Sequence, residues 1–376
     1  MIARLFGSRR AETTSAEDRV AVASQLQLTW WRFRRHKLAL ASGIVVILFY
    51  MIALFADFLA INDPHDTDAR RTYSPPQAIS FFDDDGSFRP YVTVLRARRD
   101  PRTFRMVFDQ SSKVYLTMFA PGYTYSVLGL FETNVHILGL KDPQPTDGLY
   151  LLGTDRLGRD VWSRLMVATR VSLTIGLVGV VISLFLGVLL GGISAIYGGV
   201  VDMTIQRIIE IIRSMPTIPL WMGLAAALPS DWPVTRVYFA ITVIIALLAW
   251  TDLARVVRGK FLSLREEDFV TAAELAGAGQ MRIIFRHMLP SFLSHIIAAT
   301  SLALPAMIIS ETSLSFLGLG LRPPAISWGI LLQDAQNIEA LALAPWLLAA
   351  AVPVILVILA FNFLGDGLRD AADPYG

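Results

Sequence analysis

The stretch GTDRLGRD, from Gly153 to Asp160, has the glycine spacing of a phosphate-binding loop. In such a loop Lys and then Ser or Thr follow the second glycine, because the ammonium reaches the phosphates and the hydroxyl binds magnesium. Arg159 and Asp160 occupy those two positions here. The carboxylate would repel phosphates, and no other stretch continues this spacing with Lys and then Ser or Thr. We therefore expect no nucleotide site in this chain.

Few other groups could do chemistry. The sequence has no Cys, which excludes disulfides, thiolate catalysis and Cys-based metal sites. Its five His residues lack metal-ligand spacing, and there is no Gly-x-Ser-x-Gly elbow. We expect no metal, no cofactor and no enzymatic activity.

His295 lies in an apolar run, and a packed, hydrogen-bonded imidazole is the favoured interpretation. Contact with a transported solute is the alternative, because ionisable groups inside membranes often mark a transport path.

Composition indicates a membrane protein. Hydrophobic residues make up 54% of the 376 residues, charged residues only 17%, and the mean hydropathy is +0.53. Soluble domains carry about 25% charged residues. The net charge of +2 gives no reason to expect a nucleic-acid partner. A spanning helix needs about 20 mostly apolar residues. Six stretches meet this requirement: 38–60, 171–197, 205–228, 237–253, 288–309 and 341–364.

Lys and Arg gather before the first span and between the fourth and fifth spans. Short loops rich in these residues face the cytoplasm. The pattern predicts that both termini are cytoplasmic. The expected organisation is a cytoplasmic segment 1–37, a first span 38–60, an extracytoplasmic insert 61–150, a five-helix domain 151–366 and a cytoplasmic tail 367–376.

The segment 61–150 interrupts the apolar pattern. Stretches such as RPYVTVL and KVYLTMF are rich in β-branched and aromatic residues, whereas DDDGS and APGY are typical of turns. We predict a small β-containing insert outside the membrane. A long loop packed on the membrane domain is the alternative.

A short polar helix is expected at 266–278, between the fourth and fifth spans. Glu267 and Asp268 fall in its first turn, which suits the positive end of the helix dipole. Gly277 is placed to end it. Helical spacing puts four apolar residues on one face. These are Phe269, Ala272, Ala273 and Ala276. Small side chains let a partner approach closely, so we expect a docking surface for another protein. A helix lying on lipid is the alternative, and it would need larger apolar residues.

The sequence TAAELAGAGQMRIIFRHMLP, which ends at Pro290, resembles the cytoplasmic EAA loop of ABC importer permeases. The family pattern is E-A-A-x3-G-x9-I-x-L-P. Ala272, Ala273, Gly277, Leu289 and Pro290 match it. Thr271 stands where the family has Glu, and His287 where the general pattern has Ile. An RHxLP ending is typical of the peptide-transporter branch.

Three further stretches resemble C-type permeases of dipeptide and oligopeptide (peptide/nickel) importers. They are LGTDRLGRDVWSRLMVATRVSL, ETSLSFLGLGLRPPAISWG and AFNFLGDGLRDAADP. The resemblance covers the first span and the chain from about Leu151 onward, but not clearly the insert.

The resemblance implies an all-α, MetI-like permease with six transmembrane helices in a bacterial inner membrane, in contact with its lipids. It also implies a second, non-identical permease, two cytoplasmic ATPases that hold the ATP and magnesium, and an extracytoplasmic binding protein. The helix at 266–278 would dock in the ATPase and couple hydrolysis to alternating access. Its apolar residues would shape the contact, while Glu267 and Asp268 would pair with basic groups or remain solvated.

Outside the membrane, we expect Asp155, Arg159 and Asp160 to pair locally and position the external mouth of the pathway, rather than to contact substrate. Glu311 ends the fifth span, where it is either a gate residue or a structural cap. The expected cargo is peptide. An oligosaccharide, opine or nickel complex carried by the same machine is the alternative. A membrane-anchored sensor without transport is an alternative of another class.

Overall fold

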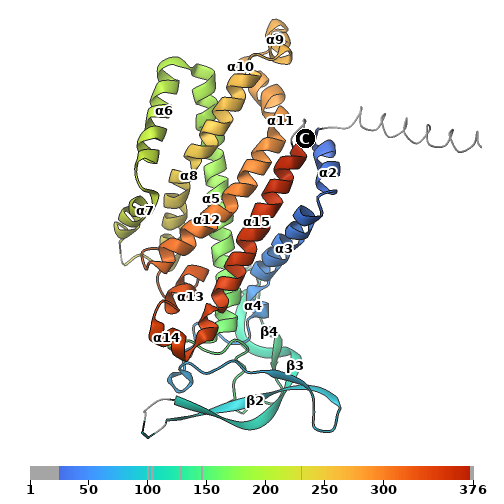
Figure 1. Ribbon diagram of the computed structural model, residues 1–376, viewed down its shortest axis with the longest axis vertical. Coiled ribbons are helices and arrows are strands. Elements are labelled where there is room, and N and C mark those ends of the chain that lie inside the picture. Colours follow the sequence, from blue (N-terminus) through green and yellow to red (C-terminus); the bar gives the residue numbers. More distant parts are fainter. Residues whose placement is uncertain are drawn as a thin grey trace, which may run out of the picture.

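Long apolar helices form a bundle with a small antiparallel sheet at one end (Figure 1). This computed structural model describes residues 25–99, 101–102, 106–127, 129–144, 147–229 and 231–372. Within them, 5 helices are long and apolar enough to cross a membrane, and there are 6 crossings if a bent pair counts as one span. The predicted fold class, a helical membrane protein with a small β insert, is confirmed.

The helix α5 is the centre of the bundle. It runs from Val161 to Tyr197 and so begins well before the apolar run at 171. Its first turn is fixed by Asp160, whose carboxylate accepts hydrogen bonds from the backbone N–H groups of Trp162 and Ser163. Three of the other long helices pack on it directly, and they are α3 (Lys37–Leu54), α8 (Val234–Leu264) and α12 (Leu293–Phe316). The helix α15 (Ala351–Ala372) packs on α3 and α12.

The third predicted span is not one helix. It divides into α6 (Gly199–Ser214) and α7 (Thr217–Ala226), which are bent by 89°. Met215 between them is extended, with φ −87° and ψ 140°. The ring of Pro216 disfavours the helical conformation for the residue before it, which explains the break.

The sixth predicted span is also interrupted near its start. A short helix α14 (Ile338–Leu343) is followed by a 3₁₀ turn at Pro345–Ala350, which leads directly into α15. Pro345 has the same effect on Ala344, whose φ is −138° and ψ 67°. The helix α13 (Trp328–Asp334) and α14 lie at the sheet end of the bundle (Figure 1).

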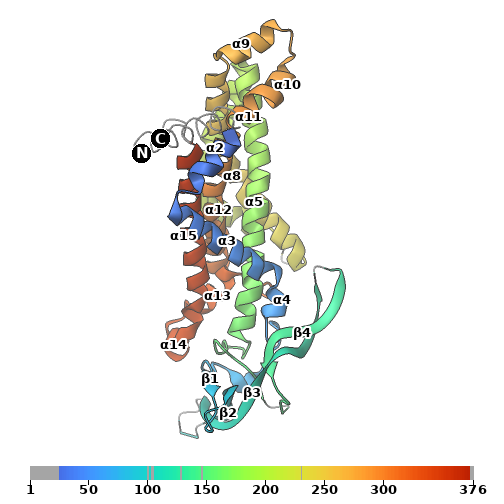
Figure 2. The ribbon, with the colours of Figure 1, turned by 90° about the vertical axis from the view of Figure 1, so that its right-hand side faces the viewer.

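The opposite end of the bundle carries α9 (Asp268–Leu275), which projects beyond the other helices (Figures 1 and 2). Three short segments lead from it into α12: α10 (Gln280–Arg282), a π-helix (Ile283–Met288) and α11 (Leu289–Ser291). The helix α2 (Gln25–Phe33) lies at this end too, where Phe33 packs with Ala371 near the end of α15.

The insert is a four-stranded meander. Its strands are β1 (Ile79–Phe82), β2 (Phe88–Arg99), β3 (Met106–Val127) and β4 (Phe131–Leu140), with a 3₁₀ turn at Ala69–Arg71 before them. The predicted turn at APGY is wrong, because these residues lie inside β3. The register with β4 shifts between Pro121 and Tyr125, so the strand bends there rather than ending. Figure 2 shows β3 and β4 curving toward α4 (Ala56–Leu59).

Candidate functional site

The helix α9 is shorter than the expected range 266–278. Glu267 is its N-cap residue, although its side chain makes no capping hydrogen bond, and Asp268 lies in the first turn. Ala276 is the C-cap, and Gly277 follows with φ +81°. Residues with a Cβ rarely adopt this left-handed conformation, so the turn after α9 depends on glycine.

One side of α9 is anchored and the other is free. Val270 is 1% exposed and packs in an apolar cluster with Ile283, Ile284 and Met288. Ala273, predicted on the docking face, is half-buried against this cluster. The exposed apolar residues are Phe269, Ala272, Leu275 and Ala276. Sequence reasoning missed Leu275, which is 85% exposed. Its signal was a large apolar residue at the end of a short helix that lies between two polar stretches.

The anchoring cluster joins α9 to three spans. It includes Ala195 of α5, Phe261 of α8 and Phe292 next to α12. Of the remaining residues of the loop, Leu289 packs on the cluster, His287 is half-buried in the π-helix and Pro290 is exposed. Continuous apolar packing therefore connects α9 to the ends of α5, α8 and α12.

An ion pair holds the same end of the bundle together. Arg258 of α8 donates from Nε and a terminal nitrogen to the two carboxylate oxygens of Asp202 at 2.6 and 2.5 Å. Ser194 of α5 also donates to Asp202, which lies in the first turn of α6. The sequence analysis did not find this arrangement, although an acid just after the Gly198–Gly199 pair was a visible signal.

At the sheet end, Asp155, Arg159 and Asp334 form a buried charge cluster. Arg159 donates from Nε to Asp155 at 2.7 Å, and one of its terminal nitrogens lies 3.5 Å from Asp334 of α13. Arg164 of α5, whose side chain is 2% exposed, has its Nε 3.6 Å from Asp155. The cluster therefore ties the loop before α5 to α13.

Asp160 does not join this cluster. It caps α5 and accepts a hydrogen bond from Asn62 Nδ2 at 3.2 Å, which fixes the chain after α4. Burial raises the pKa of the Asp160 carboxyl to about 6. Local packing explains Gly158, the second glycine of the stretch that resembled a phosphate-binding loop. Gly158 has φ +74°, and a Cβ there would lie 1.9 Å from the carbonyl oxygen of Asp68.

Glu311 lies within α12 rather than at its end and is fully buried. Ser172 of α5 donates to it at 3.1 Å, and Ser315 at 2.9 Å. The two serine oxygens in turn accept the backbone N–H groups of Trp328 and Leu321 at 3.1 Å. Glu311 therefore joins α5, α12 and the start of α13 through hydroxyl groups.

A cavity of about 520 Å³ opens among α5, α6, α7, α8 and α12. Arg213 of α6 and Asp252 of α8 form an ion pair on its wall. Their side chains are 43% and 74% exposed. His295 is not among the described residues that line the cavity and lies near the start of α12. The sequence analysis missed Asp252, a lone acid in an apolar run, which is a recognised signal of function in membranes.

Two family models match this chain. One, described as "Binding-protein-dependent transport system inner membrane component", matches residues 183–375, and the other, "N-terminal TM domain of oligopeptide transport permease C", matches residues 24–76. Most of the insert lies between the two matches.

Individual proteins are similar as well. An oligopeptide transport system permease protein of Haemophilus influenzae is 40% identical over 230 residues, which is 61% of this chain and 71% of the relative. A glutathione transport system permease protein of Pectobacterium atrosepticum is 37% identical over 224 residues, covering 59% and 72%. The inward-facing MetNI methionine ABC transporter has a TM-score of 0.41 and 23% identity, over 56% of this chain and 94% of that one.

Proposed function

This chain belongs to the family of binding-protein-dependent transport system inner membrane components, and on that premise we propose that it is one permease subunit of a peptide importer. The observation that carries the proposal is the placement of α9 at the tip of the bundle. Apolar side chains on one side of this helix are exposed, and those on its other side pack on the bundle. The printed functions of the two similar permeases, oligopeptide and glutathione transport, support peptide as the cargo.

The end of the bundle that carries α9 is cytoplasmic in this proposal. Arg255 and Arg258 of α8 and its C-cap residue Arg265 lie toward that end, in keeping with the positive-inside rule. The packing of Phe33 against Ala371 puts the described beginning and end of the chain on the same side. The sheet then lies outside, where it can meet an extracytoplasmic binding protein.

The mechanism is alternation between two packed arrangements of the spans. A partner ATPase binds the free side of α9, and closure of the ATPase dimer on ATP displaces that helix. Val270 carries the displacement into the cluster with Phe261 and Phe292, and so to α8 and α12. ATP and magnesium belong to the partner subunits, so the chain is not itself an enzyme. A second, non-identical permease completes the pathway.

The test is a charge on the free side of α9. Ala272→Arg should abolish peptide uptake while membrane insertion and the amount of protein stay unchanged, because a guanidinium would have to be buried in the contact. The matched control is Ser263→Arg, another exposed position, near the end of α8. Uptake that survives Ala272→Arg would contradict the placement of the ATPase contact.

A further inference from the structure

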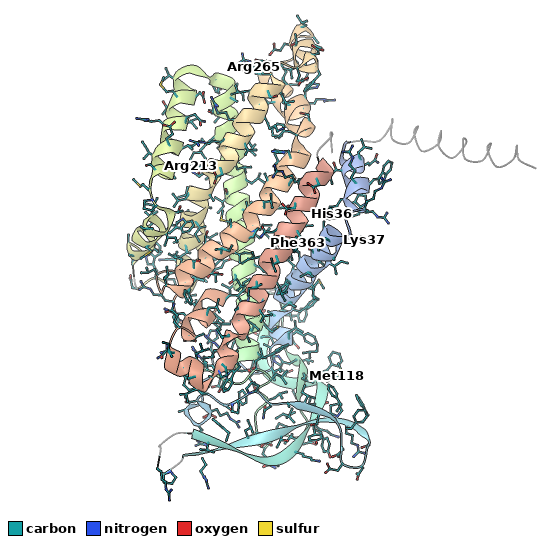
Figure 3. The ribbon with its side chains drawn as sticks, viewed as in Figure 1. His36, Lys37, Met118, Arg213, Arg265 and Phe363 are labelled. Carbon is teal, nitrogen blue, oxygen red and sulfur yellow. The ribbon has the colours of Figure 1, made fainter. Side chains whose placement is uncertain are left out.

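The wall of the cavity beside α6 carries charges of both signs. They lie within the membrane domain, where an ionised side chain is energetically unfavourable. In Figure 3 the labelled Arg213 lies between α6 and α8, away from both ends of the bundle, whereas Arg265 marks the end that carries α9. Arg213 pairs there with Asp252 and not with Glu210, its neighbour on α6. Ionised side chains in membrane spans face water-filled paths or protein, and they are functional candidates by default.

Two further polar atoms of the cavity wall lack partners. Trp221 Nε1 of α7 and Thr300 Oγ1 of α12 are buried and have no hydrogen-bond partner within the described part of the chain. A buried polar group without a hydrogen-bond partner destabilises the site. By contrast, Thr251 and Ser310 on the same wall donate to backbone carbonyl oxygens of their own helices, at 3.0 and 2.7 Å. The unmet groups therefore mark where a ligand would bind.

These groups define the chemistry of the ligand. The indole N–H only donates, so its partner must be an acceptor such as a carbonyl oxygen. Asp252 suits an ammonium group, and Arg213 suits a carboxylate. A neutral sugar has no charged group to offer to either side chain. A short peptide with free termini supplies an ammonium, a carboxylate and amide carbonyl groups together.

We propose that Arg213 and Asp252 form a substrate subsite that binds the carboxyl and amino termini of a short peptide inside the membrane domain. This inference rests on the proposed function and adds to it the class of peptide and the residues that select it. Without substrate the two side chains neutralise each other. When a peptide binds, the two side chains separate, and each one pairs with the peptide terminus of opposite charge. The exchange of partners therefore costs little electrostatic energy.

The size of the site limits the peptide. A cavity of about 520 Å³ lies within the range of small-ligand pockets, about 300–1,000 Å³. An extended peptide of two or three residues spans about 7 to 11 Å. Two side chains that touch when empty, one of them a long and partly exposed arginine, can separate to that distance. Longer peptides would contact the two charges in succession.

The test compares two peptides in the complete transporter, reconstituted in liposomes with its ATPases, second permease and binding protein. One is trialanine, and the other is trialanine amide, which lacks the carboxylate. The measured quantity is the ratio of their uptake rates. Selection by the binding protein is the same for every permease variant, so a change in this ratio reports on the permease alone.

Arg213→Gln should lower the ratio by about 10- to 100-fold, the range expected for losing one charged hydrogen bond. Asp252→Asn should do the same to the ratio of trialanine to N-acetyl-trialanine. Arg213→Lys keeps the charge and should keep most of the ratio. The matched control is Arg207→Gln, which breaks the Arg207–Glu210 pair on the same helix, away from the described cavity lining.

An equal loss of uptake for both peptides in Arg213→Gln would make the pair structural and overturn the subsite, and so would an unchanged ratio. If Arg213→Gln does not assemble, Asp252→Asn decides alone by the same criterion. An unaltered transporter that takes up no peptide but another solute would instead contradict the proposed function.

Discussion

Removing the Glu311 carboxylate should destabilise the membrane domain. In Glu311→Ala the hydroxyl groups of Ser172 and Ser315 lose their shared acceptor, while each still receives a backbone N–H from Trp328 or Leu321. Their orientation is therefore constrained, and neither can easily turn to another acceptor. Two buried hydroxyl groups without an acceptor cost about 1–3 kcal/mol each, so we expect a loss of about 2–6 kcal/mol.

The assay is thermal unfolding of the purified protein in detergent. At about 2 °C per kcal/mol for a chain of this size, the Tm should fall by about 4 to 12 °C. Glu311→Gln retains one acceptor oxygen and should lose less than Glu311→Ala. The control is Ser301→Ala on the same helix, where the hydroxyl donates to the carbonyl oxygen of Ile297 in its own helix. A Tm for Glu311→Ala within 1 °C or so of the control would refute the claim that this network holds α5, α12 and α13 together.

Three further predictions concern the sheet end of the bundle. Gly158→Ala should lower the Tm by more than Gly86→Ala does. Both glycines have a positive φ, but only at Gly158 does a carbonyl oxygen occupy the space of the new Cβ. Equal decreases in Tm would contradict this contact. His136→Ala should make the insert more sensitive to protease. The buried ring lies 3.0, 2.7 and 2.9 Å from the backbone carbonyl oxygens of Asp57, Ala60 and Tyr123, and so bridges the insert to the chain around α4. An unchanged rate of digestion would argue against this bridge. The Asp160 pKa is raised from 3.8 to about 6, so the folded state holds this proton more tightly than the unfolded state does. The contribution of this proton to stability is complete well below pH 4 and is lost as the pH rises through about 6, and between pH 4 and pH 6 it falls by about 2 kcal/mol. Asp160→Asn should remove this fall in Tm measurements at the two pH values, and a pH dependence that persists would rule out Asp160 as its source.

The fold class could be predicted because apolar run length and β-rich segments are local signals. Val171 to Tyr197 reads as a span from composition alone. Helix breaks were harder to predict. Pro216 and Pro345 were visible, but proline inside a span is tolerated when neighbouring helices satisfy the freed carbonyl groups. Whether a proline bends or divides a helix therefore depends on tertiary packing.

The polar site was predicted only where its residues are close in sequence. The helix at α9, with Gly277 at its end, follows from local spacing. The pairs Asp202–Arg258 and Arg213–Asp252 join residues 56 and 39 positions apart on different helices. Their pairing depends on how the helices cross. A lone acid in an apolar run indicates that a partner exists, but not which residue it is.

The most direct test of the central claim uses the absence of cysteine in this sequence. Ala272→Cys places a single thiol on the free side of α9, and Ser263→Cys places one near the end of α8. Each variant is assembled with its ATPase and treated with a short thiol-to-amine cross-linker, and the products are identified by mass spectrometry. We predict a cross-link from position 272 to the ATPase that weakens when nucleotide changes the conformation, and little from position 263. Efficient cross-linking at 263 with none at 272 would contradict the assignment of α9 as the coupling element.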